Sequence, residues 1–426
     1  MTSEASGPPV LVGPAARLND RVRFLVELAR RLHLAGVSAS RLEGAMRSVA
    51  ASIGVRAEIW STPTGLLLSL SDAGTPHGTQ ETRVLRLEPG NIHLGAMARL
   101  DTIAGEVVAG AMSVEEAWDA MHALDRPITT REELVGVAAF GLAAASVAGL
   151  LRTSWVDVVV ALVLGLVIGW IDLLSRTRPH LNAASEAVAA LVATALATAF
   201  AHFVAPLSLQ TVIVAALIVL MPGLSLTTAV AELASQQLVT GTTRFAGAMT
   251  VLLKLTFGSV AASQLVLAAG WAPMAGTPEP LPRAVEFVAA IAAAFSFAVL
   301  FRASRRDVLL VMASAILGYV LTRIGSSWFG VVASGTFAGA VFFSSLTMAA
   351  LANLYGRMAN RPGALVRVPG IMLLVPGSVG FRALAFVMER DYTLGFDTLV
   401  AVLSAVLALV AGLLFGSLLV PPRRHL

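Results

Sequence analysis

The sequence predicts a mostly α-helical, polytopic membrane protein with about ten transmembrane helices in two inverted five-helix repeats, preceded by an N-terminal α+β cytoplasmic domain. Three observations lead to this fold class. Hydrophobic residues make up 57% of the 426 residues and charged residues 13%, about half the charge of a soluble chain. Long apolar stretches begin only near Arg131. A Pro-Gly pair interrupts two of these stretches at matching positions.

The chain divides into a tail and three domains. Residues 1–16 are rich in Ser, Pro and Gly and lack the basic start and apolar core of a signal peptide, so we expect a disordered tail. Residues 17–131 are predicted to form the cytoplasmic α+β domain. Residues 132–270 are predicted to form the first five-helix membrane repeat, and residues 284–420 the second.

The front domain combines helical and strand patterns. Apolar residues recur at helical spacing from Leu18 to Leu34. Ser-x-x-Glu capping boxes at Ser40–Glu43 and Ser113–Glu116 predict two further helix starts. The expected elements are helices at 18–34, 40–52, 95–109 and 113–124, and strands at 55–60, 65–70 and 83–87.

The rest of the chain contains apolar stretches that approach or exceed the roughly 20 residues needed to cross a bilayer. Arginines gather in the loops that a cytoplasmic start places inside, among them Arg176, Arg305 and Arg306. Both termini are therefore predicted to be cytoplasmic, in a multi-pass protein of the cell membrane. The predicted spans are residues 134–151, 155–174, 184–205, 207–221, 245–270, 284–301, 308–323, 327–352, 366–378 and 396–420.

The fourth and ninth spans are short, and each runs into a Pro-Gly pair. Leu220–Gly223 and Leu374–Gly377 share this pattern 154 residues apart. The same offset also matches Ala229 with Ala383, Ala231 with Ala385, and Gly241 with Gly395. Because five spans is an odd number, the second half must insert with the opposite orientation, as in many secondary transporters. The alternative is that Pro-Gly only ends a helix and that the other matches arise by chance in an Ala-rich chain.

A break inside a membrane helix frees backbone groups that can hold a small polar solute. A helix N-terminus adds a positive field suited to a carboxylate. Lys254, the single lysine, is predicted to face the cavity and to pair with a substrate carboxylate or with Glu232; snorkelling toward the cytoplasmic face is the alternative. The candidate substrate-binding residues are Pro222, Gly223, Ser225, Thr227, Thr228, Lys254, Pro376, Gly377, Ser378 and Arg382.

The candidates for proton coupling are Glu232, Asp157 and Asp172. Glu232 can instead line a solvated loop, and the two aspartates lie near span ends, where wetted charges are ordinary. We expect no metal and no cofactor, because the chain has no cysteine and no histidine has a partner at metal-ligand spacing. The basic residues are dispersed and Lys254 follows no glycine loop, so neither nucleic-acid binding nor a P-loop ATPase is predicted.

One group of front-domain residues follows the pattern of a known transporter family. The residues are Gly36, Ser38, Ser40, Arg41, Glu43, Met46, Val49, Gly54 and Thr62-Pro63-Thr64, continued by Arg83-Val84-x-Arg86 and Ser113–Ala117. On these residues the chain resembles the threonine/serine exporter family, whose layout of a soluble cytoplasmic region and ten spans covers almost the whole chain. The resemblance implies efflux of threonine and serine driven by the proton gradient. Relatives with the halves on separate chains look like succinate exporters, which implies a dicarboxylate as the alternative solute.

These patterns together favour a secondary active exporter of small amino acids, threonine and serine, driven by the proton-motive force through alternating access. Lys254 and Arg382 are natural carboxylate partners in the dicarboxylate alternative. An intramembrane hydrolase is a further alternative, but Gly223-x-Ser225 fails the nucleophile-elbow pattern because position 227 is Thr. An uncoupled channel is the last. The expected partners are a small polar solute, protons and the lipid bilayer. The sequence leaves open whether the chain forms a homo-oligomer.

Overall fold

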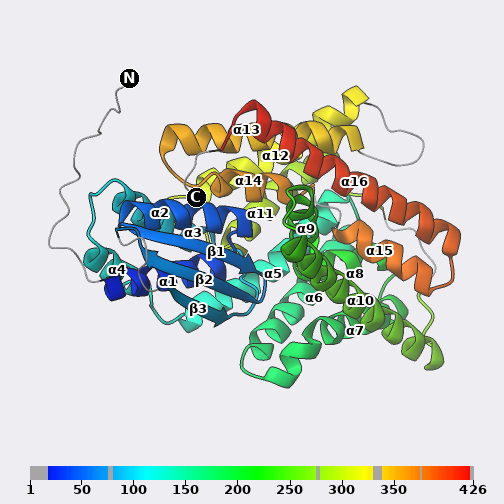
Figure 1. The fold of residues 1–426 in the computed structure, drawn as a ribbon. Coiled ribbons are helices and arrows are strands. Elements are labelled where there is room, and N and C mark those ends of the chain that lie inside the picture. Colours follow the sequence, from blue (N-terminus) through cyan, green and yellow to red (C-terminus); the bar gives the residue numbers. More distant parts are fainter. Residues whose placement is uncertain (1–17, 75–79, 275–278, 330–337, 375–376, 423–426) are drawn as a thin grey trace. The chain divides into compact units, whose positions relative to one another are not determined.

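The computed structural model describes residues 18–74, 80–274, 279–329, 338–374 and 377–422 (Figure 1). It divides the chain between Pro127 and Ile128 into two compact units, a front unit and a membrane unit. The tail predicted at residues 1–16 and the candidate site residue Pro376 lie outside the described residues.

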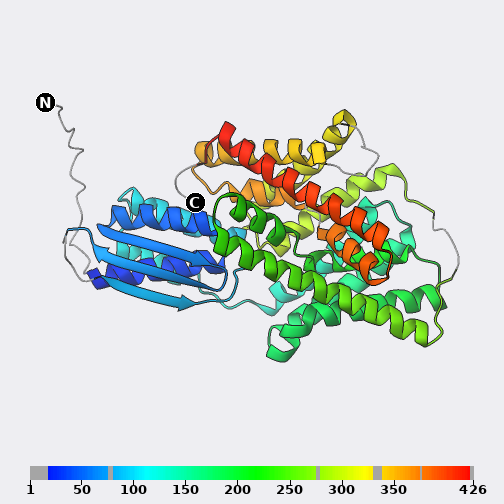
Figure 2. The same cartoon turned by 45° about the vertical axis from the view of Figure 1, so that its right-hand side comes forward.

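In the front unit, helices accompany a three-stranded antiparallel sheet with the strand order β1-β2-β3 (Figure 2). Its elements are α1 (Leu18–Leu34), α2 (Ala39–Ser52), β1 (Val55–Thr62), β2 (Gly65–Asp72), β3 (Glu81–Arg86), α3 (Leu94–Val108) and α4 (Val114–His122). Leu66, Leu68 and Leu70 are buried while the neighbouring Leu67 is exposed, because successive strand residues point to opposite faces. The helices and strands predicted for this region are confirmed.

Of the two predicted capping boxes in the front unit, one is wrong. The box of Ser113 and Glu116 is formed at the start of α4. At α2, however, the N-cap is Ser38, and it makes no side-chain cap hydrogen bond. Glu43 instead accepts a hydrogen bond of 3.0 Å from the backbone N–H of Ser61 in β1. The partner of Glu43 is thus a backbone N–H of β1, which the spacing of residues along α2 could not predict.

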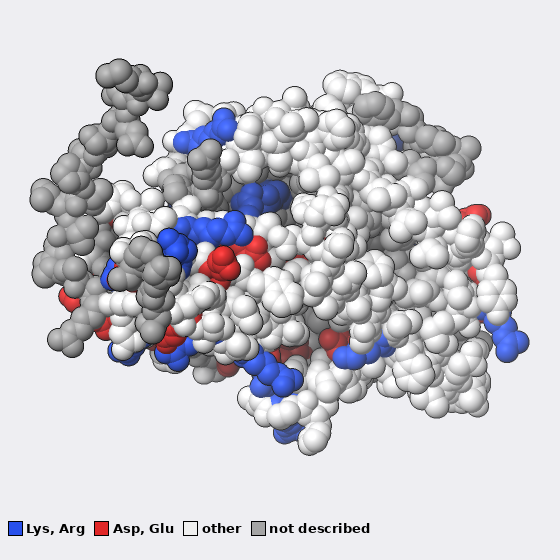
Figure 3. Space-filling model, in the orientation of Figure 1, with Lys and Arg blue, Asp and Glu red and all other residues white. Residues whose placement is uncertain are grey.

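The membrane unit contains the apolar helices. They are α5 (Thr130–Leu150), α6 (Trp155–Ser175), α7 (Pro179–Phe203), α8 (Leu209–Leu217) with a 3-10 turn (Ile218–Leu220), α9 (Gly223–Ala234), α10 (Leu238–Ala268), α11 (Arg283–Leu300), α12 (Val308–Phe329), α13 (Ala338–Ala359), α14 (Ala364–Met372), α15 (Gly377–Met388) and α16 (Tyr392–Leu419). Among the described residues, 9 helical segments are long and apolar enough to cross a membrane, or 10 with the bent α8–α9 pair. Charged side chains are sparse on the face of this unit seen in Figure 3.

The predicted spans next to the Pro-Gly pairs need correction, as does the eighth span. The fourth span does not end at its Pro-Gly pair: a second helix, α9, follows α8 after a bend of 59°. The ninth is likewise followed by α15. The eighth span, predicted at 327–352, is wrong because α12 continues to Phe329 and α13 covers Ala338–Ala359. No charged residue lies between Arg323 and Arg357, so composition does not mark the connection.

The helices of the membrane unit pack in an order that occurs twice. Helix α7 packs along α10, and α13 packs along α16 (Figure 1). Helix α8 contacts α5, α6 and α7, and α14 contacts α11, α12 and α13. Between the two sets, α5 packs against α11, α10 contacts α15, and α16 contacts α9. Several helix contacts in α5–α10 therefore have a counterpart in α11–α16.

Glycine contacts in the two sets match at the offset found in the sequence. Gly241 in α10 lies against Leu233 and the backbone of Ala229 in α9. The equivalent Gly395 in α16 lies against Val387 and the backbone of Ala383 in α15. Small residues let helices approach this closely in a membrane. The matches between Ala229 and Ala383 and between Gly241 and Gly395 thus correspond to equivalent helix contacts.

The C-terminal end of α5 lies beside the N-terminal end of α11 in space. The backbone N–H of Leu281 donates to the carbonyl of Arg152 at 3.3 Å, and the Arg152 Nε donates to the carbonyl of Leu281 at 3.1 Å. Gly149, near the end of α5, lies against Ala289 in the first half of α11. Because the two helices also pack along each other, they run antiparallel.

Gly258→Ala is expected to destabilise the membrane unit. A methyl group at this position in α10 would lie 2.1 Å from the carbonyl oxygen of Ala187 in α7. That backbone atom cannot move aside without shifting α7, so we expect a loss of about 1–3 kcal/mol and a lower Tm of the purified protein in detergent. A methyl group at Gly247, in the same helix, would meet nothing within 4 Å. Gly247→Ala is therefore the control, and equal Tm values for the two variants would contradict the tight packing.

Candidate functional site

The first residues of α9 and α15, Gly223 and Gly377, lie against each other inside the membrane unit. A Cβ atom added to Gly377, the first residue of α15, would lie 3.1 Å from the Cα of Gly223, the first residue of α9. The same Cβ would lie 3.4 Å from the Cβ of Met221. Both glycines are buried. Two candidate site residues that are 154 positions apart are therefore in contact, and the N-terminal ends of α9 and α15 meet.

The break before α9 leaves backbone donors without acceptors. The N-cap of α9 is Pro222, which makes no side-chain cap hydrogen bond. Within the described residues, the N–H groups of Leu224 and Ser225 have no protein acceptor, whereas that of Leu226 bonds to the Pro222 carbonyl at 2.9 Å. Free N–H groups and the positive end of the helix dipole together attract an anion.

The candidate hydroxyl residues divide into two kinds. The Thr227 hydroxyl donates to the Gly223 carbonyl at 3.2 Å, and the Thr228 hydroxyl donates to the Leu224 carbonyl at 2.8 Å, so both protons are used within α9. The hydroxyls of Ser225 and Ser378 are half-buried and have no protein partner among the described residues. The two serines are therefore the available hydroxyls beside the breaks.

The two candidate cations have different surroundings. Lys254 donates to the carbonyl of Ala183 at 2.8 Å and pairs with Glu186 at 3.4 Å, both in α7. The predicted pairing of Lys254 with Glu232 is therefore wrong, since that glutamate has another partner. Arg382, in α15, is exposed and forms no ion pair within the described part of the chain.

Glu232 forms a buried ion pair between neighbouring helices. Its side chain, in α9, is 4% exposed. The guanidinium of Arg244, in α10, donates to its two oxygens at 3.0 and 3.4 Å. This forked geometry satisfies the carboxylate and ties α9 to α10. Protonation of the carboxyl would remove the charge that holds the pair together.

The two candidate aspartates have simpler surroundings. Asp172 pairs with Arg176 one turn later at 2.6 Å on an exposed helix face, where such a pair contributes little stability. Asp157 is fully buried but accepts hydrogen bonds from Ser154 at 3.0 Å and from the Ser208 backbone at 2.9 Å. Its two oxygens therefore accept hydrogen bonds from backbone N–H groups and from a hydroxyl.

Sequence reasoning missed two buried carboxylates in the second set of helices. Glu286 in α11 is 8% exposed, accepts from the Tyr319 hydroxyl, and pairs with Arg323 at 2.8 Å. Asp307, just before α12, pairs with Arg361 at 2.5 Å. The spacing of Ser304 and Asp307 repeats that of Ser154 and Asp157, a signal that was available in the sequence.

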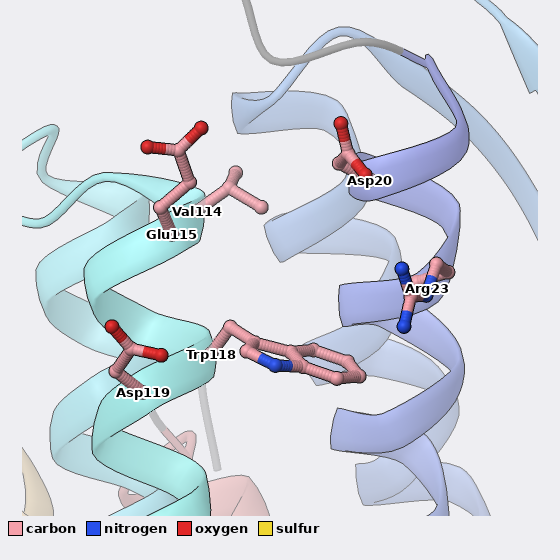
Figure 4. Close-up of a pocket in the computed structure, with 6 residues that line it drawn as sticks. All are labelled: Asp20, Arg23, Val114, Glu115, Trp118 and Asp119. Atoms are coloured by element: carbon pink, nitrogen blue, oxygen red, sulfur yellow. The ribbon is translucent and has the colours of Figure 1, made fainter.

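The front unit has a surface groove of its own, between α1 and α4 (Figure 4). It is lined by Asp20, Arg23, Val114, Glu115, Trp118 and Asp119. The guanidinium carbon of Arg23 lies 5.3 Å from the ring centroid of Trp118, a cation–π contact. This groove is open to solvent and belongs to a different unit from the helix breaks.

The apolar helices define a multi-pass membrane protein. The chain belongs to the threonine/serine exporter family. One model of this family, described as a threonine/serine exporter, matches residues 23–266. A second, described as "Threonine/Serine exporter, ThrE", matches residues 286–419. The second match begins in α11, so the border between the models separates the two sets of helices.

Three curated relatives of the chain are fungal membrane proteins. "Pheromone-regulated membrane protein 10" of Yarrowia lipolytica is 25% identical over 249 residues, which is 57% of this chain and 20% of the relative. The protein of the same name from Debaryomyces hansenii is 24% identical over 260 residues, 60% of this chain and 25% of the relative. That of Eremothecium gossypii is 23% identical over 351 residues, 80% of this chain and 46% of the relative. The chain thus spans less than half of these relatives. No solved structure matches.

A double variant, Met221→Cys with Gly377→Cys, is expected to form a disulfide on mild oxidation. The Cβ atoms at these positions lie 3.4 Å apart, close to the usual ~3.5–4.5 Å for a disulfide. The natural chain has no cysteine, so no other thiol competes. With a protease site inserted between α10 and α11, the two fragments should stay joined on a non-reducing gel.

The control for this cross-link is Gly247→Cys with Gly377→Cys. A side chain at Gly247 meets nothing within 4 Å, so the fragments of this variant should separate. Fragments of the Met221→Cys, Gly377→Cys protein that separate in the same way would contradict the contact between the breaks.

Proposed function

We propose that the chain is a secondary active exporter of threonine and serine that binds its substrate where α9 and α15 begin. The observation that carries the proposal is the contact of the two breaks beside the unpaired N–H groups of Leu224 and Ser225. Such groups suit the carboxylate of an amino acid. The hydroxyls of Ser225 and Ser378 are available for its polar groups. The family to which the chain belongs supports the choice of solute.

The transport mechanism in this proposal depends on inverted repeats, α5–α10 and α11–α16. Two-fold symmetry requires each contact between unlike elements to occur twice, and the contacts of α10 with α15 and of α16 with α9 are such a pair. The antiparallel α5 and α11 give the orientation that inversion requires. Rocking of one repeat against the other would then expose the break to each side of the membrane in turn.

We assign proton coupling to Glu232. It is the candidate carboxylate that is both buried and held by one cation, Arg244, in the helix next to its own. Proton binding would release α9, whose N-terminal end lies at the proposed substrate site, from α10. Asp157 and Asp172 have structural roles in this proposal. The arginine-rich loops support a cell-membrane protein with both termini in the cytoplasm. The exporter family supports a transporter rather than an enzyme.

Purified protein in liposomes is expected to catalyse counterflow of labelled threonine and serine severalfold above empty liposomes. Succinate should neither exchange nor compete, because Lys254 is paired with Glu186 and the side chain of Arg382 is exposed rather than buried at the helix starts. Succinate counterflow without threonine counterflow would contradict the proposal and favour a dicarboxylate exporter.

Removing both free hydroxyls, with Ser225→Ala and Ser378→Ala, is expected to raise the KM for threonine roughly tenfold, the sum of two hydrogen bonds of about 0.5–1.5 kcal/mol. The matched control is Ser263→Ala, whose hydroxyl bonds to the Ser259 carbonyl within α10. An unchanged KM in the double variant would place the substrate elsewhere.

Glu232→Gln is expected to separate coupling from binding. Glutamine keeps the size of the side chain but cannot take up the proton, so counterflow should persist while uphill efflux driven by a proton gradient is lost. Asp172→Asn, which removes an exposed ion pair, should keep both activities. Uphill efflux by the Glu232→Gln protein would show that this carboxylate does not couple transport to protons.

A further inference from the structure

Two helix corners in the membrane unit have the same sequence pattern. Residues 150–157 join α5 to α6, and residues 300–307 join α11 to α12. Both read Leu-x-Arg-x-Ser-x-x-Asp, 150 residues apart. The arginine of each corner has a left-handed backbone, with φ of 54° at Arg152 and 49° at Arg302. The corners are therefore alike in sequence and in backbone conformation.

The aspartate of the first corner holds the start of α8. One oxygen of Asp157 accepts from the backbone and the hydroxyl of Ser154, both at 3.0 Å, which caps α6. The other oxygen accepts from the backbone N–H of Ser208 at 2.9 Å. Ser208 is the N-cap of α8, and Asp157 is 0% exposed. One buried carboxylate thus joins the corner to the outer end of α8.

The aspartate of the second corner holds the chain before α14. Asp307 accepts from the Ser304 hydroxyl at 2.5 Å and from the two guanidinium nitrogens of Arg361 at 2.5 and 3.0 Å. Arg361 lies just before α14, which begins at Ala364. Burial raises the pKa of the Asp307 carboxyl, but the hydrogen bonds from Arg361 and Ser304 outweigh this effect, so its pKa lies below the ordinary value.

Each anchored segment leads directly to a break. From Ser208, the helix and its 3-10 turn cover Leu209–Leu220, roughly 18 Å at about 1.5 Å per residue, and Pro222 follows. From Arg361, α14 leads toward Gly377, the first residue of α15, and Leu374 is the last described residue before it. A short helix held at its outer end transmits that position to its inner end.

We propose that Asp157 and Asp307 are positioning residues that hold the outer ends of α8 and α14 and so set which side of the membrane the break faces. This inference rests on the proposed function. In the inverted arrangement, the first corner lies on the outer face and the second on the cytoplasmic face. Loss of the first anchor therefore favours opening to the outside, and loss of the second favours opening to the cytoplasm.

Two substitutions remove one anchor each and leave the corners intact. Ser208→Pro deletes the N–H that Asp157 binds, and the φ of −73° at Ser208 is close to that of proline. Its side chain makes no cap hydrogen bond, so nothing else is lost. Arg361→Ala removes the ion pair of Asp307 but keeps its bond with Ser304. Both leave the aspartates in place.

The test uses Ser225→Cys as a single thiol at the break in the otherwise cysteine-free chain. A membrane-impermeant maleimide is applied to right-side-out and to inside-out vesicles. We expect Ser208→Pro to speed labelling from the outside and slow it from the cytoplasmic side, each severalfold, and Arg361→Ala to do the reverse. Asp172→Asn is the control and should change neither rate.

Opposite shifts in the two variants support the inference, because a merely structural role would not reverse sign between them. Shifts in the same direction, or none, overturn it while leaving the proposed substrate site standing. A thiol at position 225 that is unlabelled from both sides in every background would overturn the proposed site and the inference together. Should Arg361→Ala fail to reach the membrane, Asp307→Asn removes the same ion pair and must give the same shift.

Discussion

The structure depends on one constraint: backbone groups inside a bilayer must find partners within the protein or a polar ligand. Two interrupted helices would violate this constraint if each break faced lipid. Here the first residues of α9 and α15 pack against each other, since a Cβ atom added to Gly377 would lie 3.1 Å from the Cα of Gly223. Within the described residues, the N–H groups of Leu224 and Ser225 have no protein acceptor, and we propose a polar solute as their partner.

The features that recur in both sets of helices are helix contacts, whereas two of the ion pairs occur in one set only. The breaks, the glycine contacts and the two aspartate corners recur, and each holds helices together. The ion pairs of Lys254 with Glu186 and of Glu232 with Arg244 lie only in the first set. At the offset of the Pro-Gly pairs, the position equivalent to Lys254 is Ala408. If the two sets form the proposed inverted repeats, a symmetric scaffold does not need these pairs, and we propose that they serve the directional part of transport.

Local patterns predicted much of this fold. Hydropathy and periodicity located the strands and most apolar helices, and the first Pro-Gly pair located the bend between α8 and α9. The eighth span could not be placed, because the chain from Ile324 to Gly356 has no charged residue to mark a connection. The ion-pair partners of Lys254 and Glu232 could not be predicted either, because the residues on one helix face do not show which neighbouring helix packs against it. The Asp157 and Asp307 corners were present in the sequence, but their importance lies in hydrogen bonds to distant segments.

The most direct measurement is an experimental structure of the protein with threonine bound in a lipid environment. The account predicts a carboxylate oxygen of threonine within about 2.7–3.2 Å of the backbone nitrogens of Leu224 and Ser225, with the starts of α9 and α15 on either side. Threonine bound elsewhere, with these two N–H groups paired to protein acceptors, would contradict it.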